Sequence, residues 1–178
     1  QRNIIFWKLG EIPNIQSIIP ELDTLLVETN LQDKKVIIRV SEKEIFMIWC
    51  GGNRCLGIDK NGLAFTSAPE VEGHIITKIR SENDIRINNT VTSQENWQTI
   101  TKTISQLKTI GIYPEETTIK NKELNEWTLK TNEETLIIFS TNFIPKNLGS
   151  TIKKLDQEIG LKNIKSIDLR VEDKIYYK

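Results

Sequence analysis

Two hydrophobic periodicities alternate along the 178-residue chain. Short runs in which apolar and polar residues take turns predict β-strands, whereas runs with an apolar residue every three or four positions predict helices. Strand-like runs cover about nine segments, and the two clearest helical runs lie in the second half of the chain. With turn signals between successive strands, this mixture predicts an α+β fold with a mostly antiparallel sheet and two helices packed on it.

The first part of the chain combines one helical segment with one strand. Residues 3–19 place isoleucine and leucine near helical spacing, with Pro13 beginning a new turn and Pro20 ending the segment. Residues 22–28 follow as an alternating strand.

A long apolar run from Lys35 to Cys50 predicts the next strand. Three consecutive charged residues, 42–44, interrupt this run, and we expect the chain to bend there and pass from one small domain to the next. We therefore divide the chain into residues 1–43 and residues 44–178.

Turn signals separate the strands of the second region. Gly51–Arg54 predicts a hairpin turn, Asp59–Gly62 a second turn, and Glu172–Asp173 a third near the end of the chain. Strands are also predicted within residues 75–91 (one or two strands), 117–122, 127–130, 135–140, 166–171 and 175–177.

Two amphipathic helices are predicted among these strands. Apolar residues recur at three and four positions from Trp97 to Ile110, and Gly111 ends that helix. The second helix covers Lys146–Glu158, with Gly160 as its end. From their positions in periodic segments next to turns, six residues are predicted to lie in the core: Trp49, Phe65, Trp97, Ile104, Trp127 and Leu155.

Composition narrows the function classes. Lysine plus arginine equals aspartate plus glutamate, 24 against 24, and this balance argues against a nucleic-acid binder. No apolar run approaches the roughly 20 residues that span a bilayer, and residues 1–10 do not resemble a secretory signal. Because the chain begins at Gln1, we expect it to be a fragment with any membrane anchor upstream of it.

The sequence offers little catalytic chemistry. His74 is the single histidine, and a lone histidine is more often structural than catalytic or metal-binding. No serine stands in a nucleophile elbow, and Gly51–Gly52 lacks the lysine that would hold a phosphate. The acidic pairs Glu115–Glu116 and Glu133–Glu134 lie in polar stretches typical of a solvated surface. We therefore expect no catalytic residue, no cofactor, no metal and no small-molecule substrate.

The two cysteines, Cys50 and Cys55, bracket the Gly51–Arg54 turn. Side chains that face each other across a hairpin have Cβ atoms about 4.5–5.5 Å apart, close to what a disulfide requires. Two reduced thiols, or half of a metal site, are the alternatives, but two cysteines cannot complete a four-ligand zinc shell. The favoured disulfide indicates an oxidising compartment outside the cytoplasm.

Several features, taken in order, resemble the extracytoplasmic region of the bacterial cell-division family FtsQ/DivIB. These features run from about residue 20 to the end: Pro20–Leu22, Val36–Val40, Glu42–Lys43, Trp49, Ile58–Phe65, Ala68–Pro69, Gly73, the hairpin at Trp127–Leu129, the helix Lys146–Glu158 and Ile167–Arg170. Residues 1–43 would then form part of a POTRA domain and residues 44–178 the β domain of the family. A whole POTRA domain has more elements before its strand pair than this chain has, and Val171 stands where familiar members have an aromatic residue.

The resemblance implies a non-enzymatic scaffold of the division machinery, anchored in the cell membrane by a single span outside this chain, with this region on the extracytoplasmic side. Its β domain would bind small coiled-coil partners of the FtsB/FtsL type and support septum formation. Two alternatives remain: a POTRA-containing module of an outer-membrane assembly or secretion system, or an unrecognised cell-wall enzyme.

The resemblance places the partner-binding site at the final strand, on Val171, Lys174, Ile175, Tyr176 and Tyr177. A terminal edge strand has backbone groups free to pair with another chain. The tyrosines offer apolar area with a polar hydroxyl, and lysines there favour an acidic partner segment. The alternative is a strand that only completes the sheet.

Overall fold

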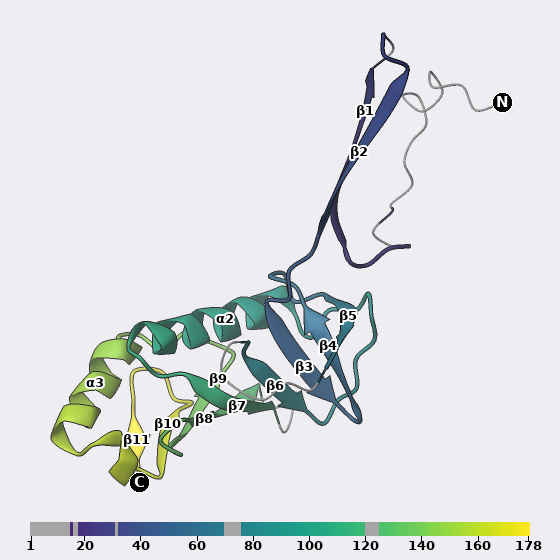
Figure 1. Cartoon of the computed structure of the whole chain (residues 1–178). Helices are drawn as coiled ribbons and strands as arrows, with labels where there is room; N and C mark the ends of the chain where they lie inside the picture. The colour runs from purple at the N-terminus through teal and green to yellow at the C-terminus, as the bar shows by residue number, and fades with distance from the viewer. Residues whose placement is uncertain (1–14, 16–17, 31, 70–75, 120–124) are drawn as a thin grey trace. The chain divides into compact units, whose positions relative to one another are not determined.

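The computed structural model describes residues 15, 18–30, 32–69, 76–119 and 125–178 (Figure 1). The chain divides into two compact units, Gln1–Glu44 and Ile45–Lys178. The predicted helix over residues 3–19 falls almost entirely outside the described residues.

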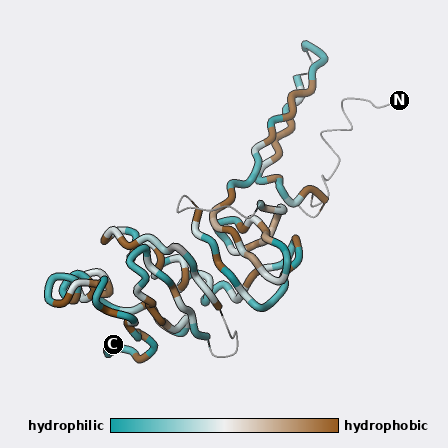
Figure 2. Tube along the Cα trace, turned by 60° about the horizontal axis from the view of Figure 1, so that its bottom comes forward, coloured by the Kyte–Doolittle hydropathy of each residue, from teal (hydrophilic) through white to brown (hydrophobic). Residues whose placement is uncertain are grey.

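The first unit contains one antiparallel pair, β1 (Leu22–Asn30) and β2 (Lys35–Glu42). Its register places five aliphatic side chains and one threonine on the same face: Leu25, Val27, Thr29, Val36, Ile38 and Val40. Figure 2 shows both hydrophobic and hydrophilic stretches along the two strands. The other face carries Leu26 and Ile37 as well as polar groups, and there Arg39 donates to Glu28 at 2.6 Å. That this unit is part of a POTRA domain stays a prediction.

The second unit is a nine-stranded sheet with two helices, in the part of the chain that the structure describes. Its strands are β3 (Met47–Gly51), β4 (Arg54–Ile58), β5 (Ala64–Ala68), β6 (Lys78–Ser81), β7 (Pro114–Ile119), β8 (Glu126–Thr131), β9 (Leu136–Ser140), β10 (Ser166–Leu169) and β11 (Tyr176–Tyr177). The helices are α2 (Gln94–Thr109) and α3 (Leu148–Glu158), and a 3-10 turn covers Leu161–Asn163. The strand order is β11-β10-β9-β8-β7-β6-β3-β4-β5.

The predicted α+β class is confirmed, and the sheet is mostly antiparallel. Among the described strands of this sheet, five neighbouring pairs are antiparallel and three are parallel. Two of the parallel pairs follow from the helices: α2 connects β6 to β7 and α3 connects β9 to β10, and a helical crossover joins parallel strands. The run from Lys35 to Cys50, predicted as one interrupted strand, forms two strands in different units.

Helix α2 matches its prediction. The side chain of Ser93 accepts a hydrogen bond from the backbone N–H of Asn96 and caps the helix, a common way to satisfy a first-turn donor. Gly111, with φ of 84°, follows its C-terminal end. Helix α3 begins at Leu148, later than predicted, because Asn147 adopts a left-handed conformation with φ of 55°.

The core lies between the two helices and one face of the sheet, and both helices cover the same side (Figure 1). The strand register aligns buried side chains in a row across this helix-covered face: Leu56, Trp49, Ile79, Thr117, Leu129, Ile137 and Ile167. All six residues predicted for the core are buried, the most exposed being Leu155 at 8%. The core prediction is therefore confirmed.

The predicted turn at Asp59–Gly62 contacts and positions helix α2. The Asp59 carboxylate accepts backbone hydrogen bonds from Asn61 and Leu63, at 2.8 and 3.0 Å. The Trp97 indole donates to the backbone oxygen of Lys60 at 3.0 Å. A Cβ at Gly62 would lie 3.0 Å from the Trp97 ring, and φ there is +83°, so glycine suits both the backbone and the contact.

We predict that Trp127→Ala lowers the free energy of unfolding by about 3–5 kcal/mol, because it removes a large side chain from the buried layer. Equilibrium denaturation measures the loss. Thr128→Ala is the matched control: Thr128 lies next in the same strand with its side chain on the opposite face, and its change should cost less than about 1 kcal/mol. Equal stability of Trp127→Ala and the parent chain would contradict the packing described above.

Candidate functional site

Strand β11 forms one edge of the nine-stranded sheet and pairs only with β10. Lys178 and Ser166 exchange two backbone hydrogen bonds, of 3.0 and 3.2 Å, so they form a hydrogen-bonded pair. In an antiparallel ladder such pairs alternate with non-hydrogen-bonded pairs. Tyr177, opposite Ile167, therefore directs its N–H and C=O away from β10. The outer side of β11 thus presents a donor and an acceptor to a further strand.

The five residues predicted for partner binding lie together along this edge but face different ways. Val171 and Lys174 form the turn before β11, closed by a hydrogen bond of 3.2 Å between their backbones. Ile175 packs partly buried against the core. The side chain of Tyr177 shares the face of Ile167, whereas Tyr176 lies on the opposite face beside Asp168, and the tyrosines are 56% and 54% exposed.

The other edge of the sheet, β5, is largely closed. The backbone of Ala64 accepts a hydrogen bond from Asn88 and donates one to Asn89, which covers the start of the strand. Pro69, with no N–H, follows its last residue. Of the residues between them, the register leaves Ser67 with its backbone groups directed outward. The two edges therefore differ: β5 is closed on both sides of Ser67, whereas no such cover flanks Tyr177 among the described residues.

The direction in which the backbone groups of β5 point follows from the pairing of β3 with β4 in the hairpin. Cys50 and Cys55 are directly opposite each other and joined by the predicted disulfide, with their Cα atoms 4.0 Å apart. So short a separation marks a non-hydrogen-bonded pair. The hairpin turns through Gly52 and Asn53, and the positive φ of Gly52, 58°, is what a type II′ turn requires at its first central residue.

The Asp168-Leu169-Arg170 segment forms a charged cluster beside the open edge. Arg170 donates to both carboxylate oxygens of Asp168, at 3.0 and 2.7 Å, and to Glu126 on β8 at 2.7 Å. These charged hydrogen bonds lower the pKa of Asp168 and raise that of Arg170. The cluster links the end of β10, the strand that pairs with β11, to β8.

A second ion pair fixes the turn that leads into β11. Lys146, just before α3, lies 3.2 Å from Glu172 and 3.7 Å from Asp173. The hydrogen bond with Glu172, and then the charge of Asp173, raise the pKa of Lys146. These exposed contacts join the segment before α3 to the turn that precedes β11.

Sequence reasoning missed Glu126 and Lys146. The spacing of Asp168 and Arg170 contained a signal, since residues two apart on a strand share a face. The contact of Arg170 with Glu126 joins residues 44 apart in the chain, and no local pattern indicates it.

For the remaining chemistry, the structure gives three findings. The single histidine, His74, lies outside the described residues. Within the described ranges, no three or more histidine, cysteine, aspartate or glutamate side chains gather closely enough to hold a metal ion. No described helix is both long enough and apolar enough to cross a membrane.

Compared with models of protein families and with curated proteins, the chain matches none.

We predict that intact-mass measurement shows the Cys50–Cys55 disulfide in the unreduced protein, as a mass lower by two hydrogen atoms than after reduction. Closing so short a loop contributes only about 2 kcal/mol in the chain-entropy model, so the reduced protein should remain folded. Two thiols that can be alkylated without reductant would contradict this pairing.

Arg170→Gln should lower the free energy of unfolding at neutral pH by about 0.5–1 kcal/mol, a value kept small because the guanidinium is partly exposed and screened. The folded-state pKa of Asp168 is lowered, so the pair stabilises the fold fully above the ordinary carboxyl pKa of about 4. Its contribution is lost as the pH falls through the lower, folded-state pKa.

Denaturation of both proteins from pH 7 to pH 2 measures this loss, which should appear as convergence of the two stabilities at the acid end. Lys154→Gln is the control, since it removes an exposed pair with Glu158, 3.8 Å long, and should change stability less. A constant difference between Arg170→Gln and the parent chain at every pH would contradict the assignment.

Proposed function

We propose that Ile45–Lys178 is a protein-binding module that captures an extended partner segment on the outer side of β11. The observation that carries this proposal is the difference between the two sheet edges. One edge is covered by residues 88–89 and followed by Pro69, whereas the other presents the N–H and C=O of Tyr177. Edge strands with open backbone groups are a common means of peptide capture.

The side chains at this edge suit a partner that is both apolar and acidic. Tyr176 and Tyr177 project to opposite faces of the sheet, so an added strand would contact one aromatic ring on each face. Tyrosine combines a large apolar area with a hydroxyl that can form a hydrogen bond. Lys174 and Lys178 are exposed, and their charges favour aspartate or glutamate in the partner.

A partly formed pocket extends the site along the turn. It has a volume of about 230 Å³, lies between the segment before α3 and the β10–β11 turn, and includes Phe143, Leu148 and Ile175 in its lining. An apolar side chain of the partner could enter it once the partner backbone has paired with β11. The backbone would then supply affinity and the pocket would supply specificity.

The biological setting that we propose follows the resemblance to FtsQ/DivIB. The protein would be a non-enzymatic scaffold of the division machinery, held at the cell membrane by an anchor outside this chain, with Ile45–Lys178 on the extracytoplasmic side. Its partners would be small coiled-coil division proteins of the FtsB/FtsL type. The Cys50–Cys55 disulfide is compatible with an oxidising compartment.

We predict that Tyr177→Pro weakens binding of such a partner by about tenfold or more. The substitution removes one well-formed hydrogen bond of the interface, and the proline ring obstructs strand pairing. The fold should survive, because the lost N–H points away from β10 and proline is tolerated at such an edge position. Binding of a synthetic segment of the partner, measured by calorimetry, provides the test.

Ser67→Pro is the matched control, since it removes the outward N–H of the opposite edge and should leave capture unchanged. Deletion of Ile175–Lys178 should abolish capture while leaving a folded domain. Undiminished binding by a folded Tyr177→Pro protein and by the folded deletion variant would rule out this site.

A further inference from the structure

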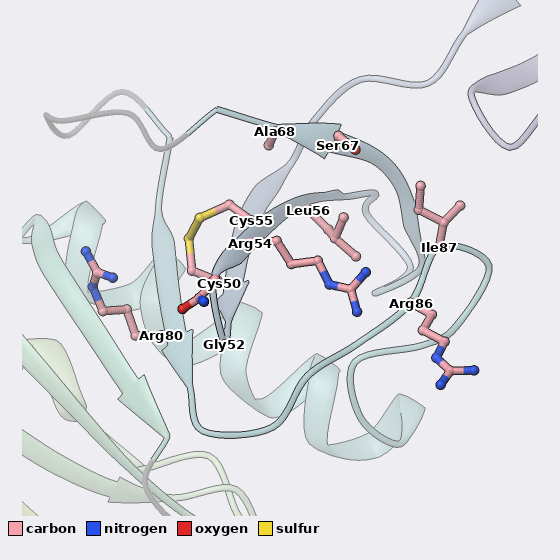
Figure 3. Close-up of a pocket in the computed structure, with 11 residues that line it drawn as sticks. Cys50, Gly52, Arg54, Cys55, Leu56, Ser67, Ala68, Arg80, Arg86 and Ile87 are labelled. Carbon is pink, nitrogen blue, oxygen red and sulfur yellow. A yellow bond between two sulfur atoms is a disulfide. The ribbon is translucent and has the colours of Figure 1, made fainter.

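A second hollow lies at the end of the sheet opposite β11, around the disulfide-linked hairpin (Figure 3). Its volume is about 910 Å³. Three arginines, Arg54, Arg80 and Arg86, contribute to its lining, and none of the described residues that line it carries a carboxylate. The hollow is therefore basic although the whole chain has no net charge.

The segments around this hollow are joined by a disulfide and an ion pair. The disulfide joins β3 to β4 at the hairpin end. Arg54, next to the turn, donates two hydrogen bonds to the carboxylate of Asp84 and so ties the hairpin to the segment after β6. A Cβ at Gly51 would collide with the backbone oxygen of Asn83, so glycine permits this close approach. Arg54 and Arg86 thus project from a constrained hairpin and loop, and Arg80 projects from strand β6.

The charges of the three arginines are not equally compensated. Arg54 pairs with Asp84, and this bond lowers the pKa of the carboxyl. Arg80 lies 3.3 Å from Glu116. The backbone oxygen of Arg86 accepts a hydrogen bond from Asn89, but the guanidinium of Arg86 forms no ion pair or hydrogen bond with the described residues, although its charge also lowers the pKa of Asp84. Arg86 is therefore the guanidinium most available to a ligand.

The arrangement of the arginines indicates the shape of the ligand. Figure 3 shows Arg54 and Arg86 on one side of the hairpin and Arg80 on the other side, beyond the disulfide. Because these charges do not converge on one point, a single small anion cannot reach all of them. A chain with several negative groups can.

Two neighbouring features favour a peptide over a phosphate polymer. Ile87 lines the hollow with an apolar side chain that is 38% exposed. Ser67 lies in the lining, and its outward backbone groups are the part of the β5 edge that residues 88–89 leave uncovered. An extended peptide can satisfy both features, whereas a polyphosphate has neither an apolar side chain nor an amide donor.

We propose that this hollow is a second protein-binding site, which takes an extended acidic peptide segment with carboxylates directed at Arg86 and Arg54 and an apolar side chain at Ile87. It lies at the opposite end of the sheet from the partner site at β11, so two ligands could bind at once.

The test measures the fluorescence anisotropy of a short labelled peptide in which glutamate alternates with leucine, bound to the whole chain. We expect the acidic peptide to bind and the corresponding glutamine–leucine peptide to bind much more weakly. Arg86→Gln should weaken binding by about tenfold, the effect of losing one charge-assisted hydrogen bond. Lys102→Gln, which removes one positive charge from the exposed side of α2, should bind as the parent chain does.

Three outcomes would overturn the proposal. The first is equal affinity of Arg86→Gln and the parent chain. The second is loss of peptide binding on deletion of Ile175–Lys178, which would assign the peptide to β11. The third is binding of inorganic polyphosphate without binding of the acidic peptide, which would assign the hollow to a phosphate polymer.

Discussion

Burial of one apolar layer beneath α2 and α3 holds Ile45–Lys178 together, and the position of every other feature depends on it. The layer runs across the sheet from Leu56 to Ile167, so strands far apart in the chain share one core. Because a side chain on a strand alternates faces, fixing this layer also fixes which groups appear on the opposite face. The register of β10, and through it the orientation of Tyr177, is set in this way.

An open sheet has two edges, and in this domain the two edges differ in how far their backbone groups are covered. Natural sheets protect their edges with covering segments, short strands or proline. Residues 88–89 and Pro69 protect β5 in this manner. No comparable cover contacts β11 among the described residues, and the ion pairs of Arg170 and Lys146 hold the strand and its turn in position.

Local patterns in the sequence were sufficient for much of this fold, for identifiable reasons. The spacing of apolar residues from Trp97 to Ile110 predicts helix α2, because a helix face repeats every 3.6 residues. The turn residues between Cys50 and Cys55 predict the hairpin. The parallel pairings of β3, β6 and β7 left no such signal, since they depend on the burial of Ile79 between strands distant in sequence. Likewise, the edge position of β11 was inferred from a resemblance, and the basic hollow has no local signal, because Arg54, Arg80 and Arg86 line one hollow only in the folded domain, where Arg54 binds Asp84.

The position of β11 at one end of the sheet also has a consequence for the order of folding. Its pairing with β10 is its sole place in the sheet, so no other strand requires it. The core beneath both helices can therefore form before β11 pairs with β10, and loss of this pairing leaves the other strand pairs of the sheet in place.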